Sequence, residues 1–229
     1  KYKFSNEKHT LGSGLVKDAY RVNAGSFMRE MHDILKYQGI LSYEEFDQKK
    51  INANELTYKG EVYQTIVFSC GSDQQLSSFF NEVEIQQTKG QILTINSEQL
   101  TEEETWNHKG FILPIGSNLF KAGATIEWDV NDAKITEGGK RNLINVIDGI
   151  FSGTYHVVSQ IAGIRPTVHD RRPVMGEHPI HKGIYMFNGL GTKGYLMAPL
   201  LAEEMADFMI SGKELHKEVQ LSRFYKNKG

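Results

Sequence analysis

The sequence predicts an α/β (α+β) protein with two lobes, and three observations carry this prediction. The apolar run at 62–69 is typical of a strand buried on both faces, which favours a parallel or mixed sheet covered by helices. The strands expected between 88 and 164 follow one another closely, which favours a largely antiparallel sheet. Near the C-terminus, Leu201, Met205 and Phe208 recur at helical spacing and predict a helix with one buried side.

The first part of the chain is expected to hold one helix and a hairpin. Apolar residues recur at helical spacing after Ser26, and Gly39 is a stop signal for that helix. The pair Lys59–Gly60 is typical of a hairpin turn between two strands. The elements expected here are a helix at 26–37, a candidate strand at 40–46, and strands at 56–58 and 61–69.

The second part of the chain is richer in expected strands. Gly116, Ser117 and Asn118 predict a turn between two strands, whereas the apolar residues from Leu143 to Ile150 recur as in a helix. The elements expected here are strands at 88–95, 110–115, 119–125, 156–164 and 184–187, a helix within 131–153 and a last helix at 195–210. We expect one lobe to comprise 26–74 and 182–212, and the other to comprise 1–25 and 75–181.

Composition narrows the class of protein. A net charge of −2 over 229 residues gives no electrostatic reason to expect nucleic acid or an anionic membrane as a partner. The single cysteine, Cys70, excludes an internal disulfide and favours a reducing compartment, so we predict a cytoplasmic protein. The spacing of His169, His178 and His181 fits no metal motif, so we predict surface or loop histidines and no metal site.

A glycine-rich turn joins the last strand to the last helix. Gly189, Gly191 and Gly194 let the backbone approach a ligand, and the N-terminus of the helix favours an anion or an electron-rich carbonyl. The alternative is an ordinary strand-to-helix turn. Lys193 in this turn is either a solvated side chain or a ligand contact, and the sequence does not separate the two.

Arg165 is a second candidate for ligand binding. It stands at the end of an expected strand and precedes Pro166, and arginine can grip a carboxylate with two parallel hydrogen bonds. The alternative is a structural ion pair with an acid such as Asp170.

Several segments together resemble a known family. They are GIRP at 163–166, DRRPVMG at 170–176, FNGLGTKGYLMAPLLAEEMADFM at 187–209, VYQTIVFSCG at 62–71, TKGQILTI at 88–95 and FILPIGSNLFKAGATIEWD at 111–129. Their order resembles the FAD-dependent D-amino-acid oxidase superfamily, which includes glycine oxidase and sarcosine oxidase. The family opens with a GxGxxG unit that binds the FAD pyrophosphate. This sequence has none, so it looks like the later portion of such an enzyme.

The resemblance implies a fold and a set of site residues. The fold is a partial FAD-binding Rossmann-like lobe plus a mixed, largely antiparallel substrate-binding sheet. Arg165 matches the position that holds the substrate carboxylate in several members, and Thr192 stands where some members carry a second substrate arginine. The residues implied in substrate binding are Arg165, Thr192 and Lys193, and those implied in FAD binding are Gly71, Gly189, Leu190, Gly191, Thr192, Lys193 and Phe46.

The resemblance also implies a reaction. An amino acid, an amine or a 2-hydroxy acid would lose a hydride to N5 of the flavin, and no side-chain base is required if the amine arrives neutral. The main alternative is a truncated or degenerate binding module that keeps the fold without catalysis. A nicotinamide-linked enzyme is a third reading, for which no dinucleotide fingerprint is present.

Overall fold

A computed structural model of the chain describes residues 14–73, 78–128, 130 and 132–225. It confirms the mixed α and β content that the sequence predicts. The chain divides into two compact units, which we describe separately. Unit 1 contains Gln87–Arg165, and unit 2 contains Val16–Gln86 and the C-terminal part from Pro166. The assignment of lobes at 26–74 with 182–212 and at 1–25 with 75–181 to cofactor and substrate stays a prediction.

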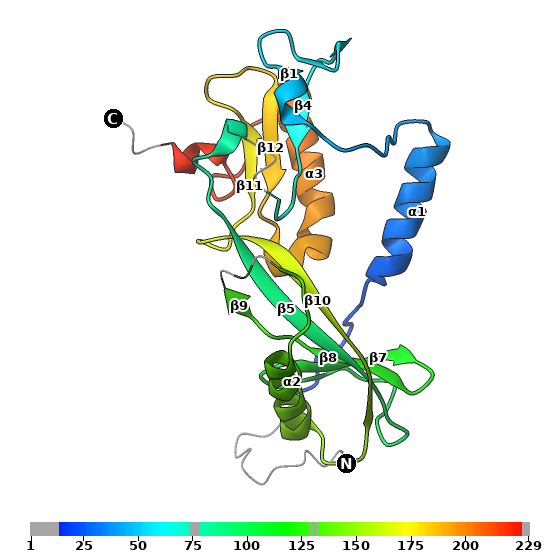
Figure 1. Cartoon of the computed structure of the whole chain (residues 1–229). Helices are drawn as coiled ribbons and strands as arrows, with labels where there is room; N and C mark the ends of the chain where they lie inside the picture. Colours follow the sequence, from blue (N-terminus) through cyan, green and yellow to red (C-terminus); the bar gives the residue numbers. More distant parts are fainter. Residues whose placement is uncertain (1–13, 74–77, 129, 131, 226–229) are drawn as a thin grey trace. The chain divides into compact units, whose positions relative to one another are not determined.

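Unit 1 is built on a largely antiparallel sheet, as predicted. Its strand order is β10-β5-β8-β7-β6, and β9 also pairs with β5 (Figure 1). The register sets Ile92 of β5 opposite Gly123 of β8, and Phe111 of β7 opposite the same glycine. The strands are β5 (Ile85–Asn96), β6 (Trp106–Asn107), β7 (Phe111–Gly116), β8 (Leu119–Gly123), β9 (Glu127–Trp128) and β10 (His156–Val168).

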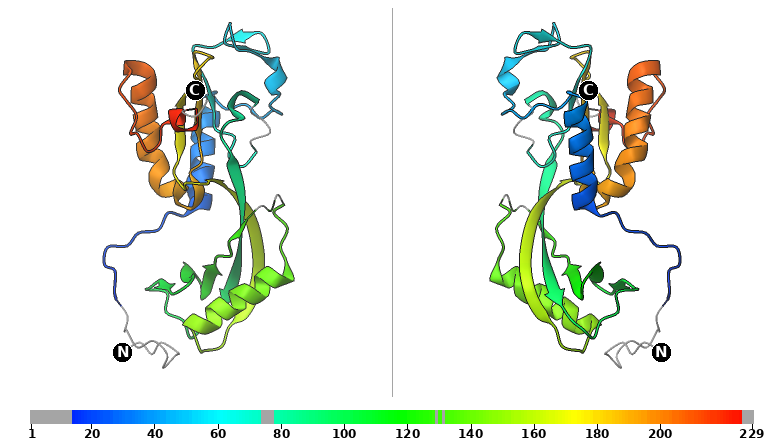
Figure 2. Two further views of the ribbon diagram at one scale, coloured as in Figure 1. Left: turned by 90° about the vertical axis from the view of Figure 1, so that its left-hand side faces the viewer. Right: turned by 90° about the vertical axis from the view of Figure 1, so that its right-hand side faces the viewer.

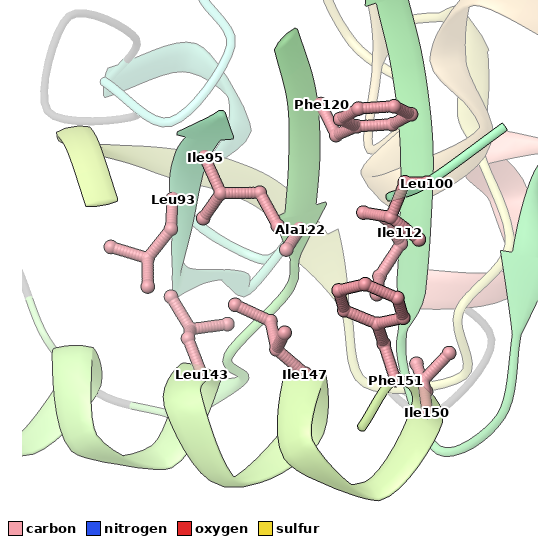
Figure 3. Close-up of a cluster of buried hydrophobic side chains, with 10 residues drawn as sticks. All are labelled: Leu93, Ile95, Leu100, Ile112, Phe120, Ala122, Leu143, Ile147, Ile150 and Phe151. Atoms are coloured by element: carbon pink, nitrogen blue, oxygen red, sulfur yellow. The ribbon is translucent and has the colours of Figure 1, made fainter. Parts of the chain in front are cut away.

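Helix α2 (Glu137–Ile150) covers one face of this sheet and closes the core of unit 1. The helix begins where the Thr136 side chain accepts a hydrogen bond from the backbone N–H of Gly139 at 3.0 Å. Figure 3 shows the apolar side of the helix against the strands. The buried side chains are Leu93, Ile95, Leu100, Ile112, Phe120, Ala122, Leu143, Ile147, Ile150 and Phe151.

Unit 2 contains the mixed sheet predicted from the apolar run near residue 66. Strand β12 (Ile184–Asn188) pairs in parallel with β4 (Ile66–Phe68) and antiparallel with β11 (Val174–Glu177). Helix α3 (Gly194–Ser211) packs on one face of this sheet, beside β11 and β12 in both views of Figure 2. Side chains along β12 alternate, because Tyr185 faces the α3 cluster while Ile184 and Met186 join a second cluster on the other face.

Two strand predictions in unit 2 are wrong. Residues 40–46 form no strand, since none of the described strands pairs with them and Glu44–Glu45 interrupt the apolar pattern. The expected strand at 61–69 is two strands, because the chain changes sheets after Val62. The other elements of unit 2 are α1 (Ala24–Tyr37), β1 (Ile51–Asn52), β2 (Thr57–Tyr58), β3 (Glu61–Val62) and the short helices η1 (Gln48–Lys50), η3 (Ser78–Phe80), η4 (Gly191–Lys193) and η5 (Leu221–Phe224).

None of the described helices combines the length and apolar character needed to cross a bilayer. Within the same residues, the His, Cys, Asp and Glu side chains do not gather in threes in a way that could hold a metal ion.

Candidate functional site

The glycine turn after β12 leads directly into α3. Gly189 and Gly191 have φ angles of +73° and +56°, a conformation that side chains with a Cβ rarely adopt. A Cβ on Gly189 would lie 2.6 Å from Cγ2 of Val168, so only glycine fits there. A Cβ on Gly191 would meet nothing closer than 3.9 Å, so the positive φ angle and not crowding favours glycine there.

Asn188 ties the turn to the end of the neighbouring strand. Its Nδ2 donates a hydrogen bond to the carbonyl of Gly71 at 2.9 Å, and its Oδ1 accepts one from the backbone N–H of Gly189 at 2.8 Å. Gly71 follows β4, the parallel neighbour of β12. The carboxyl ends of two parallel strands are therefore fixed together, which is where α/β sheets usually bind ligands.

The first turn of α3 presents backbone N–H groups beside this glycine turn. The N-cap residue Lys193 makes no side-chain capping hydrogen bond, and both Thr192 and Lys193 are exposed. An uncapped helix N-terminus carries partial positive charge and favours an anion or a carbonyl oxygen. The turn and the helix start thus offer a ligand the features that the sequence led us to expect.

In unit 1, the guanidinium of Arg165 lies directly over Gly90 of the adjacent strand. A Cβ on Gly90 would lie 2.1 Å from Nη2 and 2.3 Å from Nη1, so the arginine occupies the space that a side chain would take. Nη1 is buried and has no hydrogen-bond partner among the described residues. Burial without a nearby acid lowers the pKa of Arg165 from its ordinary value. Asp170, the expected structural partner, instead accepts a hydrogen bond from Nε of Arg223 at 3.0 Å.

Arg165 belongs to the face of the sheet that α2 does not cover. On β5, Gln91 points toward α2, because its amide bonds Thr136 at 2.9 Å and lies against Gly139. Thr88, Gly90 and Ile92 therefore point to the opposite face, since side chains alternate along a strand. Ile92 packs there against Gly123 and Phe111. A positive charge thus stands next to a partly buried apolar surface.

Comparisons with known proteins place the chain in a family. The sequence model of the family described as FAD dependent oxidoreductase (DAO) matches residues 3–208. This chain belongs to the DAO family of FAD-dependent oxidoreductases. It is 25% identical over 226 residues to a glycine oxidase of Bacillus licheniformis, a match that covers 92% of the chain and 60% of the relative. It is 32% identical over 118 residues to the uncharacterized oxidoreductase YurR of Bacillus subtilis, covering 50% of the chain and 31% of the relative.

A solved structure of a DAO relative shares the fold. The glycine oxidase of Geobacillus kaustophilus superposes with a TM-score of 0.60 at 22% identity, and the match covers 71% of this chain and 45% of that one. The chain therefore spans about half the length of this relative, and at most 60% of the two relatives above. The functional roles of Arg165, Gly71 and the residues of the glycine turn remain predictions.

Phe46, the residue expected to contact adenine, lies in an apolar cluster of unit 2. Its ring packs 5.9 Å from that of Phe68 and 5.4 Å from that of Tyr58, measured between centroids. It lies outside any strand, unlike the position expected for it. A role in binding the cofactor stays a prediction for this residue.

Sequence reasoning missed two residues that shape these sites, Gly90 and Asn188, and did not predict that His178 is buried. Gly90 is a lone glycine inside a strand, which is a sequence signal that another group approaches the strand backbone closely. Asn188 precedes the glycine turn, but its bond to Gly71 joins residues far apart in sequence. His178 was expected at the surface or in a loop, and it follows β11 but is only 6% exposed. Its Nε2 lies 2.8 Å from the carbonyl of Phe79, and its Nδ1 accepts hydrogen bonds from two backbone N–H groups.

Proposed function

We propose that this chain supplies the carboxylate-binding residue and part of the flavin-binding residues of an FAD-dependent oxidase or dehydrogenase. The substrate would be a small amine, amino acid or 2-hydroxy acid that carries a carboxylate. The observation that carries the proposal is the half-buried side chain of Arg165, whose buried Nη1 has no partner among the described residues. A buried N–H without a hydrogen-bond partner is unfavourable unless a ligand accepts from it.

Arg165 would act by binding and orienting the substrate. Its planar fork can give two parallel hydrogen bonds to a carboxylate, which fixes both the position and the rotation of the bound acid. Because Gly90 lacks a side chain, the guanidinium lies flat against β5 with its rotation restricted. A rigid anchor of this kind lowers the entropy that must be lost in reaching the reactive geometry.

The glycine turn in unit 2 would hold the flavin part of FAD. Gly191 has no side chain that would keep a flat ring away from the backbone, and the uncapped start of α3 favours an electron-rich carbonyl. Leu190, Gly191, Thr192 and Lys193 would hold the ring, with Gly71 and Gly189 fixing the turn through Asn188. When bound, FAD would supply the acceptor for a hydride from the substrate carbon. The helix start would stabilise the negative charge that reduction brings.

Relatives support the substrate class. Two of the proteins similar to this chain carry the name glycine oxidase, and a further structure with a similar fold is an iminodiacetate oxidase. Glycine and iminodiacetate each combine an amine with a carboxylate. Thr192 stands where some members of the family carry a second substrate arginine, so the substrate would differ from theirs.

Replacing Arg165 tests the proposal in an enzyme that has the full length of its relatives. We expect Arg165→Ala to raise KM for a carboxylate-bearing substrate at least about tenfold, or about 1.4 kcal/mol, because the anchoring cation is gone. Arg141→Ala removes one positive charge from an exposed position on α2 and is the matched control. An unchanged KM for Arg165→Ala would remove this residue from the substrate site.

A further inference from the structure

Among the described residues, Thr88 resembles Arg165 in having a buried polar atom without a hydrogen-bond partner, and it lies on the face of the sheet that α2 does not cover. Its Oγ1 is shielded from water and has no hydrogen-bond partner among the described residues, and the residue is 3% exposed. Burying a hydroxyl without a hydrogen bond is unfavourable, and valine has nearly the same shape. A hydrogen-bond partner would therefore stabilise this hydroxyl, and the described residues do not supply one.

Thr88 and Arg165 face the same side of unit 1. Lys89 points toward α2, since its Nζ pairs with Asp132 at 3.2 Å in the segment that precedes the helix. The flanking residues Thr88 and Gly90 therefore point the other way, and the guanidinium of Arg165 covers Gly90. The Thr88 hydroxyl and the guanidinium therefore lie at neighbouring positions on one face of β5. A carboxylate has two oxygens and can accept hydrogen bonds from two donors at once.

Apolar side chains on the strands beside β5 are accessible to water. Trp128 on β9 lies directly opposite Thr88 and is 42% exposed. Ile161 on the neighbouring strand β10 is 49% exposed, and Ile161 and Arg165 point to the same side because they lie four residues apart on one strand. Two shielded donors, one charged and one neutral, thus adjoin apolar side chains that are still accessible.

We propose that the hydroxyl of Thr88 is a second donor to the substrate carboxylate bound by Arg165. This inference rests on the proposed function and adds a residue that sets specificity for acids over uncharged amines. Thr88 would donate to one carboxylate oxygen while Arg165 donates to the other. In a setting shielded from water, a hydrogen bond to a charged oxygen is stronger than one between neutral groups. Thr88 would take no part in the transfer of the hydride.

The test compares ligand binding with stability in the full-length enzyme. The ligand is acetate, which has a carboxylate but no amine that could be oxidised. Calorimetry gives its dissociation constant for the wild type, Thr88→Val, Thr88→Ser and Arg165→Ala. We expect Thr88→Val to weaken acetate binding about tenfold and to raise the melting temperature without ligand, because an unpartnered hydroxyl is removed. Thr88→Ser keeps the donor and should bind acetate within about twofold of wild type.

The outcomes separate this inference from the proposed function. If Arg165→Ala weakens acetate binding and Thr88→Val does not, the assignment of Thr88 is wrong while Arg165 keeps its role. If Thr88→Val lowers the melting temperature, the hydroxyl has a structural partner and the inference is also overturned. If neither the wild type nor any variant binds acetate, the carboxylate-binding function itself is contradicted.

Discussion

At the scale of single residues, the contact between Gly90 and Arg165 predicts how a mutation at Gly90 changes substrate binding. A Cβ on Gly90 would lie 2.1 Å from the guanidinium of Arg165, so Gly90→Ala must displace that side chain. We expect the full-length Gly90→Ala enzyme to show a KM for carboxylate substrates raised on the order of tenfold, with little change for an amine without a carboxylate. Gly138→Ala is the matched control, because its Cβ would meet nothing within 4 Å. Equal KM values for both variants would contradict the prediction.

We expect the stability of the chain to depend on pH through the buried side chain of His178. Burial lowers the pKa of His178 below its ordinary value of 6.5, and its Nδ1 is occupied as an acceptor. The unfolded chain then binds more protons as pH falls through about 6.5, so the free energy of unfolding decreases over that range. We expect this decrease, measured by urea unfolding between about pH 7.5 and about pH 5.5, to be smaller in His178→Gln.

The exposed His169→Gln is the control for the pH experiment. It should keep the full decrease, because it leaves His178 and its hydrogen bonds in place. If His178→Gln and the wild type lose the same free energy of unfolding over this pH range, protonation of His178 is not the cause.

At the scale of elements, we expect the hydrogen bonds of Asn188 to hold two strand ends and the glycine turn together. Asn188→Leu removes the hydrogen bonds to Gly71 and Gly189 and leaves a buried N–H without its acceptor. We expect a loss of about 1–3 kcal/mol in the free energy of unfolding, measured with urea. FAD binding by the full-length protein should also weaken, whereas the exposed Asn54→Leu should change neither. Unaltered FAD affinity in Asn188→Leu would separate the turn from the cofactor.

Most elements could be predicted because their signals are local. The apolar periodicity of α2 and α3 and the turn pairs Lys59–Gly60 and Ser117–Asn118 gave the right elements in the right order. The prediction of a strand at 40–46 was wrong because a strand also needs a partner strand, and no local pattern says whether one exists. The prediction of one strand at 61–69 was wrong for a related reason, since the two halves of this segment join different sheets.

At the scale of the whole molecule, the candidate site could be predicted only in part. Arg165 and the glycine turn stood out by residue type and place in the chain. The contact of Arg165 with Gly90 and the bond of Asn188 to Gly71 join residues that are 75 and 117 positions apart. Pairs so distant leave no local pattern, so composition and periodicity do not reveal them. The orphaned hydroxyl of Thr88 is likewise visible only once the sheet has formed.

We propose that this chain forms part of a flavoenzyme that oxidises a carboxylate-bearing substrate. The most direct measurement is the absorbance of the purified full-length protein near about 450 nm, where oxidised flavins absorb, before and after anaerobic addition of an amino acid such as glycine. We predict a yellow protein that the substrate bleaches, and an Arg165→Ala variant that needs at least about tenfold more substrate for the same bleaching. A protein that stays colourless after FAD is added, or a yellow one that no amine or hydroxy acid with a carboxylate bleaches, would contradict the claim.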